Sequence, residues 1–273
     1  MLTRLRLVRG LPWTLAAVAV ASVVGAHRLA SVSSAHAGSA PRTGPVVPVL
    51  VELFTSEGCS SCPPAEDELS RLDREQPIPG VRVIAIGFHV DYWDRLGWTD
   101  PFSSSAWTAR QQDYDRATGR VYTPQAIVAG REDVVGSDGS KLHALVRDAA
   151  SYPAAQVDVT LSPDGAVPRG VRVAVHVAGL PAVAPGDQAD VRVVLVEKGL
   201  VVDVPRGENS GKHLQHAPVA RDLKSAGVVS ASGGDFDATF ALPPASHREN
   251  LSVVAIVQER GSHHVLGVGT LAL

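Results

Sequence analysis

The spacing of hydrophobic residues changes near residue 153, and this change divides the chain into two kinds of segment. Ahead of it, continuous apolar runs at 48–54 and 81–88 predict two buried strands. Between them, from Pro63 onward, apolar residues recur at helical spacing, with Leu69 and Leu72 on one face and acidic residues near the start. A strand, a helix and a second strand in this order predict a βαβ unit with parallel strands.

Four further elements complete the first segment. Residues 103–119 predict a helix that begins at serines and ends at Gly119. Residues 121–130 predict a strand, residues 131–139 a turn with a further strand, and residues 140–150 a closing amphipathic helix. We therefore expect an α/β domain over residues 48–153.

Beyond residue 153 the pattern becomes an alternation of apolar and polar residues, interrupted by Gly, Pro and Asp. Alternation of this kind is typical of half-buried antiparallel strands. We therefore expect an antiparallel all-β, sandwich-like domain over residues 154–273. The runs that carry the alternation are 155–162, 171–179, 189–198, 236–243 and 251–259.

The N-terminus has the features of a targeting segment. Basic residues precede an apolar run over residues 11–26, and Ala35-His36-Ala37 fits a cleavage site for a signal peptidase. The run is shorter than the roughly 20 residues of a membrane-spanning helix. We therefore expect a signal peptide over residues 1–37 and a flexible leader over 38–47, with an uncleaved membrane anchor as the alternative. The mature protein would be periplasmic or extracellular, without membrane contact after cleavage.

Composition and charge narrow the function classes. Apolar residues make up 45% of the chain and charged residues 19%, which is globular composition. The formal net charge is −3, and Lys and Arg do not cluster beyond the N-terminus. Nucleic-acid binders depend on such clusters to neutralise phosphates, so we expect no nucleic-acid partner.

The chain has two cysteines, Cys59 and Cys62, and three interpretations compete for them. A disulfide across two residues closes too short a loop to be a strong stabiliser. A closed zinc site would need two more ligands, and no second pair of suitable spacing follows. A redox pair fits the position after a buried strand and at the start of a helix, in an exported chain. In that case Cys59 would be the exposed nucleophile and Cys62 the resolving thiol.

A downstream motif strengthens the redox interpretation. The sequence "YTPQAIVAG" places Thr123 and Pro124 before a predicted strand, and residues 46–150 resemble a thioredoxin fold. In thioredoxin-like proteins a cis-proline precedes a strand and lies against the cysteine pair, so the resemblance implies a cis Thr123–Pro124 bond, with an ordinary trans-proline as the alternative.

The resemblance can be narrowed to one family. The stretches "VELFTSEGCSSCPPAEDEL", "FHVDYWDRLGWTDPF", "RQQDY" and "YTPQAIV" are similar to the secreted thioredoxin-like family catalogued as domain of unknown function 1223. The similarity extends to "RGENSGKHLQHAPVARDL" in the second segment. It implies an α/β thioredoxin-like domain followed by the antiparallel β domain, and a redox centre, but no particular substrate.

The same resemblance assigns a role to Glu52. Thioredoxins carry a buried acid on this strand, which moves the proton of the resolving cysteine, and burial would raise the pKa of such a carboxyl. The alternative is a strand-end glutamate that reaches solvent. Glu57, nearer the cysteines, is expected only to adjust the local field.

Two loops hold further candidate residues. Tyr92, Trp93 and Trp98 could line a groove for a peptide or cover the core beneath them. His89, before them, could approach a metal held by the cysteines, as in copper-handling relatives of thioredoxin. In the second segment the polar residues Glu208, Asn209, His213 and Arg221 could contact a ligand or form hydrogen bonds to the first domain.

These observations favour an exported thiol–disulfide oxidoreductase that acts on an extracytoplasmic protein or a small thiol, with a possible redox partner protein. Its catalytic residues would be Cys59, Cys62, Thr123, Pro124 and Glu52, and the sequence assigns no cofactor and no metal ligands. The alternatives are a non-catalytic binding or scaffold protein with a vestigial disulfide and a copper-delivery protein.

Overall fold

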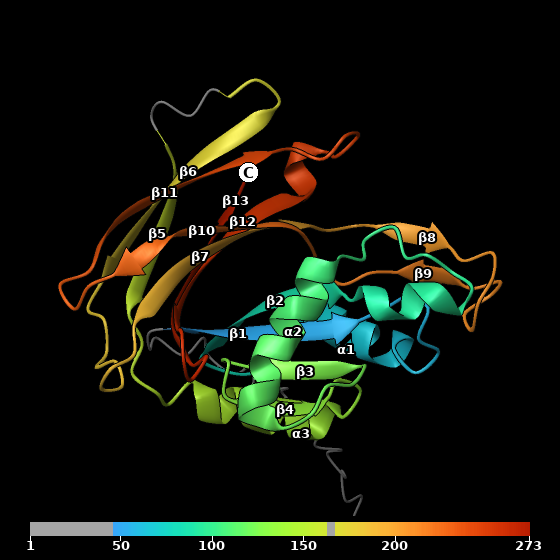
Figure 1. Cartoon of the computed structure of the whole chain (residues 1–273), viewed down its shortest axis with the longest axis horizontal. Helices are drawn as coiled ribbons and strands as arrows, with labels where there is room; N and C mark the ends of the chain where they lie inside the picture. Colours follow the sequence, from blue (N-terminus) through green and yellow to red (C-terminus); the bar gives the residue numbers. More distant parts are fainter. Residues whose placement is uncertain (1–45, 163–166) are drawn as a thin grey trace, which may run out of the picture. The chain divides into compact units, whose positions relative to one another are not determined.

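An eight-stranded mixed sheet joins the two segments of the chain (Figure 1). The computed structural model describes residues 46–162 and 167–273, so the predicted signal peptide and nearly all of the leader lie outside the described residues. The strand order is β13-β12-β7-β10-β2-β1-β3-β4. These strands are β1 (Val47–Thr55), β2 (Val81–His89), β3 (Gln125–Val128), β4 (Glu132–Val135), β7 (Ala189–Glu197), β10 (Val219–Val229), β12 (Leu251–Glu259) and β13 (Val265–Ala272).

The first segment contains the elements that its hydrophobic pattern predicts. Strands β1 and β2 are parallel, in register from the Val47–Val81 pair to the Thr55–His89 pair, and α1 (Pro63–Glu75) connects them. Strand β3 lies antiparallel on the other side of β1, and β4 follows as the edge. The remaining elements here are η1 (Asp91–Leu96), α2 (Ser105–Thr118) and α3 (Gly139–Ala149).

The helix ends follow from local chemistry. Ser104 caps α2, since its side chain accepts a hydrogen bond from the backbone N–H of Ala106, and Gly119 ends the helix with a φ of 70°. Helix α1 begins with Pro63 and Pro64, whose missing N–H groups have no partner to lose in a first turn. Cys62 is the N-cap residue of this helix.

The second segment is built from antiparallel pairings among its own strands. Strand β7 lies between β10 and β12, and β13 extends β12. A three-stranded sheet and a two-stranded ribbon accompany them. The three-stranded sheet contains β5 (Gln156–Leu161), β6 (Gly170–Ala178) and β11 (Gly234–Ala241), the ribbon contains β8 (Val201–Asp203) and β9 (His213–Gln215), and η2 (Arg248–Asn250) precedes β12. The hydrophobic pattern predicted β5, β6, β7, β11 and β12. It missed β8, β9, β10 and β13.

The segments on either side of residue 153 share one sheet, and all described residues belong to one compact unit. The physical reason is a parallel contact between β10 and β2, in which Val219 pairs with Gly87 and the Gly87 N–H donates to the Pro218 carbonyl at 2.7 Å. The change in hydrophobic pattern near residue 153 therefore lies within one continuous sheet.

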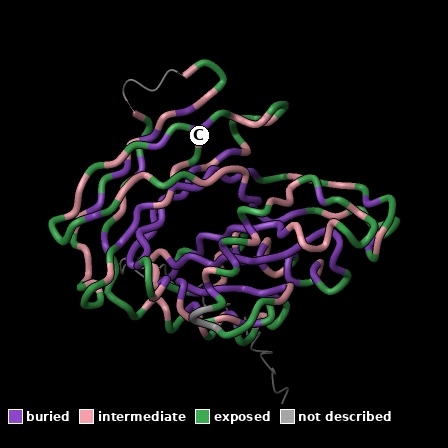
Figure 2. The backbone as a smooth tube through the Cα atoms, in the orientation of Figure 1, coloured by how far each residue is buried: buried purple, intermediate pink, exposed green. Residues whose placement is uncertain are grey.

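Three clusters of buried side chains form the core. Alternate residues of β1 point to opposite faces: Val51 packs with α1 and α3, whereas Phe54 packs with α2 and with residues of β7 and β12. On β7, Val193 packs against the three-stranded sheet and Val194 joins the cluster beneath α2. Figure 2 shows the resulting continuous burial along the central strands. Burial on both faces explains their unbroken apolar sequences.

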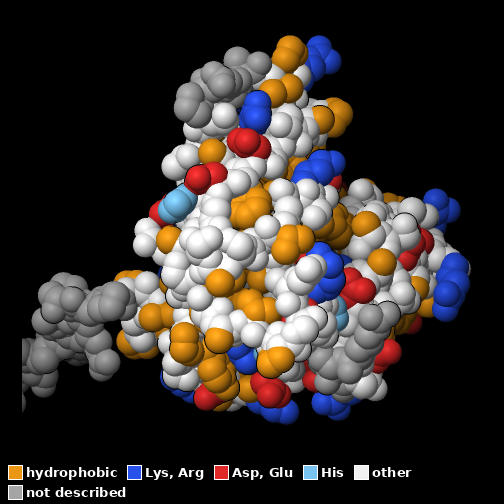
Figure 3. All heavy atoms as spheres, turned by 60° about the vertical axis from the view of Figure 1, so that its left-hand side comes forward, with side chains coloured by type: hydrophobic (Ala, Val, Ile, Leu, Met, Phe, Trp, Pro, Cys, Tyr) orange, Lys and Arg blue, Asp and Glu red, His pale blue; other side chains and the backbone are white. Residues whose placement is uncertain are grey.

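The surface of the second segment is mixed in character. Figure 3 shows basic and acidic side chains interspersed with apolar ones on the face turned forward there. Within the residues described, no helix is both long and apolar enough to span a membrane.

Substitution of two glycines tests the close contact between Gly130, which follows β3, and the backbone of His263 in the second segment. Gly119 and Gly130 share a positive φ, but a Cβ on Gly130 would lie 1.9 Å from the His263 carbonyl oxygen, whereas one on Gly119 meets nothing within 4 Å. Gly119→Ala should lower the free energy of unfolding by about 1 kcal/mol, the cost of the left-handed conformation. Gly130→Ala should cost roughly 1–3 kcal/mol more because the backbone must move. Urea denaturation measures both, and equal losses would contradict the assigned contact.

Candidate functional site

Cys59 and Cys62 form a disulfide where the loop after β1 enters α1. Cys62 is the residue that precedes the first helical turn, and its N–H donates to the Cys59 carbonyl at 3.1 Å. The loop from Ser56 folds tightly enough for the Cys59 N–H to reach the Ser56 carbonyl at 3.1 Å. The predicted position of the pair, between a buried strand and a helix, is confirmed.

The expected exposure of Cys59 is wrong. Cys59 is 0% exposed and Cys62 is 1% exposed, whereas the intervening serines face solvent. The cause is the tertiary environment of the loop. Residues of the aromatic segment after β2 and of the 206–212 loop pack around it, as the contacts of Trp93 and Asn209 show.

The Thr123–Pro124 peptide bond is cis, as the thioredoxin resemblance implies. The Thr123 hydroxyl lies 3.5 Å from Cys59 Sγ and donates to it, while the Trp93 indole N–H donates to the Thr123 oxygen at 2.9 Å. The Ser61 hydroxyl is also near Cys59 Sγ, at 3.3 Å. The threonine before the cis-proline therefore contacts the first cysteine, although 64 positions separate them in the sequence.

The loop 206–212 of the second segment holds the cysteine loop in place. The Asn209 side-chain amide, 0% exposed, donates to the carbonyl oxygens of Glu57 at 2.7 Å and of Cys59 at 3.0 Å. Glu208 accepts a hydrogen bond from the Ser60 N–H at 3.0 Å, and hydrogen bonds from Ser60 lower the pKa of Glu208. The expected hydrogen-bond network between the segments is confirmed for these two residues. His213 and Arg221 instead pair with Asp203 and Glu197.

Glu57 is buried and bonds to several elements around the cysteine loop, although the sequence predicted for it only an effect on the local field. Its carboxylate accepts hydrogen bonds from the Trp98 indole N–H at 2.6 Å and from His216 Nε2 at 2.9 Å. Its backbone N–H donates to Asp100 at 2.8 Å. Trp98 is thus part of the packing around the cysteine loop.

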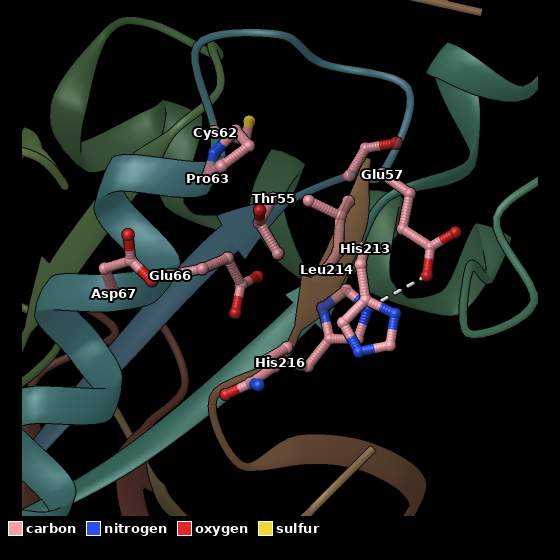
Figure 4. Close-up of a pocket in the computed structure, with 11 residues that line it drawn as sticks. Thr55, Glu57, Cys62, Pro63, Glu66, Asp67, His213, Leu214 and His216 are labelled. Atoms are coloured by element: carbon pink, nitrogen blue, oxygen red, sulfur yellow. Dashed lines mark hydrogen bonds and ion pairs between the residues drawn. The ribbon is translucent and has the colours of Figure 1, made fainter. Parts of the chain in front are cut away.

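A cavity of about 270 Å³ opens beside the disulfide and is lined by Thr55, Cys62, Glu66 and His216, among others. Figure 4 shows Glu66 extending from α1 toward the segment that carries His216, and the contact of His216 with Glu57. His89 is close to Glu66, with Nδ1 at 2.6 Å from Asp100 Oδ2 and Nε2 at 3.7 Å from Glu66 Oε1.

The carboxylates of Glu57, Glu66 and Asp100 surround His89 and His216, and the charges of this cluster shift the pKa values of His89 and Asp100. Burial alone would lower the pKa of His89, but the surrounding carboxylates, Asp100 foremost, outweigh it and raise the pKa to about 9. Burial opposes ionisation of Asp100, yet the charge and hydrogen bond of His89 keep its pKa below the usual range. Glu66, His89 and His216 each direct one donor atom inward, and these atoms lie within 4.8 Å of one another.

Sequence reasoning missed this cluster because its members are far apart in the chain. Glu66 lies one helical turn after Cys62, His89 ends β2, and His216 follows β9. Only the position of His89 at the carboxyl end of a buried strand offered a signal, and it pointed to a metal held by the cysteines.

Glu52 is buried as expected, but the structure gives it different partners. Its side chain lies on the sheet face covered by α2, where it pairs with Arg110 at 2.6 Å and accepts a hydrogen bond from the Tyr114 hydroxyl. None of its hydrogen bonds within the described residues reaches a cysteine. The contacts of Glu52 are those of a structural ion pair, and they offer no support for a proton-shuttle role.

Comparisons with known proteins agree with the family resemblance. A family model described as "Protein of unknown function (DUF1223)" matches residues 50–258. The crystal structure of a structural-genomics protein from Agrobacterium tumefaciens superimposes with a TM-score of 0.64 at 28% identity, over 84% of this chain and 95% of that one. A domain of the outer membrane lipoprotein Omp28 from Porphyromonas gingivalis matches with a TM-score of 0.29 at 18% identity, over 45% of this chain and 96% of that one. No curated protein matches.

The role of Glu52 can be tested by isosteric substitution. Glu52→Gln leaves the Arg110 charge buried without its partner, so the free energy of unfolding should fall by about 3–5 kcal/mol. Asp237→Asn, which removes the partner of Arg172 in a pair of side chains 51% and 42% exposed, should cost less than about 1 kcal/mol. Urea denaturation measures both.

A second measurement on Glu52→Gln separates stability from chemistry. Where the variant is folded, its disulfide should be reduced by dithiothreitol at the wild-type rate. A slowed reduction with unchanged stability would instead restore the proton-shuttle role.

Proposed function

The chain belongs to the DUF1223 family of unknown function, and we propose that it is an exported thiol–disulfide oxidoreductase with a thioredoxin-like first segment. The observation that carries the proposal is the Cys59–Cys62 disulfide at the start of α1, with Thr123 and its cis-proline against the first sulfur. The order of strands β2-β1-β3-β4 with three helices supports the thioredoxin-like assignment. The basic and apolar N-terminus supports export.

The exchange reaction needs two thiolate attacks. Reduced Cys59 attacks a disulfide of the substrate, forms a mixed disulfide and releases one substrate thiolate. Cys62 then attacks Cys59 Sγ, forms the Cys59–Cys62 disulfide and releases the second substrate thiolate. Two electrons pass from the cysteine pair to the substrate, and the reverse sequence oxidises a substrate dithiol. The substrate would be an extracytoplasmic protein or a small thiol.

The surroundings of Cys59 favour a thiolate. Because Pro63 and Pro64 lack N–H groups, and the Ala65 and Glu66 N–H groups bond to the Cys62 carbonyl, no free backbone donor of the first turn faces the sulfur. Stabilisation of a Cys59 thiolate therefore has to come from side-chain hydroxyls. The Trp93 N–H occupies one lone pair of the Thr123 oxygen, and the hydroxyl proton of Thr123 is directed to Cys59.

The burial of both cysteines favours a second candidate. A protein whose disulfide is only structural has no need to expose a sulfur, and exchange at a buried pair requires the loops around it to open. In that case the chain is a non-catalytic binding or scaffold protein. The two candidates differ in whether the disulfide reacts under native conditions.

Trapping experiments distinguish the candidates. Cys62→Ala removes the resolving thiol, so incubation with oxidised glutathione should yield a stable mixed disulfide at Cys59, measured by mass spectrometry. Cys59→Ala, the matched control, should yield far less because the exchange scheme assigns the first attack to Cys59. Wild-type protein should equilibrate with glutathione and report a defined reduction potential. A disulfide that resists native reduction, with no adduct in Cys62→Ala, would establish the scaffold alternative.

The contribution of Thr123 can be measured separately. Thr123→Val keeps the shape but removes the hydroxyl that donates to Cys59, so the thiolate should lose the stabilisation of one hydrogen bond to a charged group. In the reduced protein the midpoint of the pH–alkylation profile of Cys59 should rise by about one pH unit. Ser60→Ala, which removes an exposed hydroxyl of the same motif, should leave the midpoint unchanged. Equal profiles for wild type and Thr123→Val would contradict the assignment.

A further inference from the structure

We propose that Glu66, His89 and His216 form a binding site for one divalent transition-metal ion next to the disulfide. The three residues come from α1, from the end of β2 and from the segment after β9. Their inward atoms all lie within 4.8 Å of one another, and Glu66 Oε1 is 3.7 Å from His89 Nε2. Ligand atoms around a tetrahedral zinc ion are roughly 3.4 Å apart, so small side-chain rotations bring the three donors to one ion.

One side-chain atom of each of the three residues lacks a hydrogen-bond partner. Glu66 Oε1, His89 Nε2 and His216 Nδ1 are buried, and none has a partner among the described residues. The residues are 6%, 1% and 8% exposed. Buried polar atoms in native proteins are nearly always hydrogen-bonded, so three unpartnered donors or acceptors that face one another call for a shared ligand. At 3.7 Å, Glu66 and His89 are too far apart to satisfy each other.

The second nitrogen or oxygen of each of these three side chains already has a hydrogen-bond partner. His89 Nδ1 lies 2.6 Å from Asp100, and His216 Nε2 lies 2.9 Å from Glu57. Glu66 Oε2 accepts the N–H of Ala217 at 3.0 Å. When each imidazole donates to its carboxylate, the inward nitrogen is left with a free lone pair. Carboxylates that orient histidines in this way typically surround metal ligands.

The charge of the cluster also favours a cation. Glu57, Glu66 and Asp100 bring three carboxylates into a buried region, and within the described part of the chain none of them forms an ion pair with Lys or Arg. Buried charges without compensation are costly. A divalent ion bound between Glu66 and the two histidines supplies the missing positive charge. The competing occupant is a proton on His89 that faces Glu66.

The donor set indicates which ions fit. Two imidazole nitrogens and one carboxylate oxygen suit Zn²⁺, and Fe²⁺ takes the same set. Glu66 and His216 line the 270 Å³ cavity, so coordination positions on that side are open to a small ligand. The cysteines are not ligands in this site, which separates it from the alternative copper site in which the cysteines would hold the ion.

Zinc binding to the purified full-length mature chain tests the proposal. After treatment with a chelator, isothermal titration with ZnCl₂ should give one ion per chain, and saturating zinc should raise the melting temperature by roughly 5–10 °C. Glu66→Gln and His216→Gln should each weaken binding by at least about 10–100-fold. Asp67→Asn and His213→Gln change neighbouring residues that line the same cavity, and they should bind zinc as the wild type does.

A double variant separates this proposal from the redox function. Cys59→Ser with Cys62→Ser should retain the zinc site, whereas it abolishes thiol exchange. Zinc that is lost in this variant but retained in Glu66→Gln would overturn the proposal, as would a wild-type protein that binds no zinc.

X-ray absorption spectroscopy of the zinc-loaded wild-type protein identifies the ligand atoms without the need for any variant. The expected first shell contains nitrogen and oxygen at about 2.0–2.2 Å. Sulfur at about 2.3 Å would identify cysteine ligands and contradict the assignment.

Discussion

The parallel contact between β10 and β2 is the constraint on which the candidate site depends. It is short, with Val219 opposite Gly87 and one hydrogen bond from Gly87 to the carbonyl of Pro218. Since the chain enters β10 directly after residues 206–217, this contact sets that segment against the loop of the cysteines. The hydrogen bonds of Asn209 to the carbonyls of Glu57 and Cys59 follow from that position. The site is therefore made by both segments together, because residues 213–216 of the second segment line the cavity beside the disulfide.

The buried polar groups around the disulfide differ in kind from those beneath α2. Glu52 has a guanidinium partner and a tyrosine hydroxyl, so its charge is compensated within the protein. Among the described residues, Glu57, Glu66 and Asp100 form ion pairs with histidines alone. In a structural network every buried charge and polar atom has a partner within the protein. In a binding site some polar atoms have no protein partner until the ligand binds. By this criterion the α2 network is structural, whereas the histidine cluster has the features of the metal site proposed above.

The sequence predicted what local patterns determine and failed where distant residues meet. The apolar runs of β1 and β2 and the prolines of α1 have signals within a few residues, and the structure contains these elements where they were expected. Strand β10 was missed because much of it is only half-buried and carries charged residues such as Arg221 and Lys224. The burial of Glu52 could be predicted from its flanking residues, but its partner Arg110 is 58 positions away. The exposure of Cys59 was misjudged because loop 206–212 packs against it from the other segment.

The disulfide and the histidine cluster share physical connections. The Asn209 side-chain amide donates to the backbone carbonyls of both Glu57 and Cys59, and the Glu57 carboxylate bonds to His216. Helix α1 carries Cys62 at its start and Glu66 one turn later. A rearrangement of the cysteine loop on reduction therefore acts on a ligand-orienting carboxylate and on a ligand. Because coupling between two binding equilibria is reciprocal, an ion that prefers one redox state of the cysteines shifts the potential of the pair by the same free energy. Ion binding at the histidine cluster and thiol exchange at the disulfide are therefore expected to depend on each other.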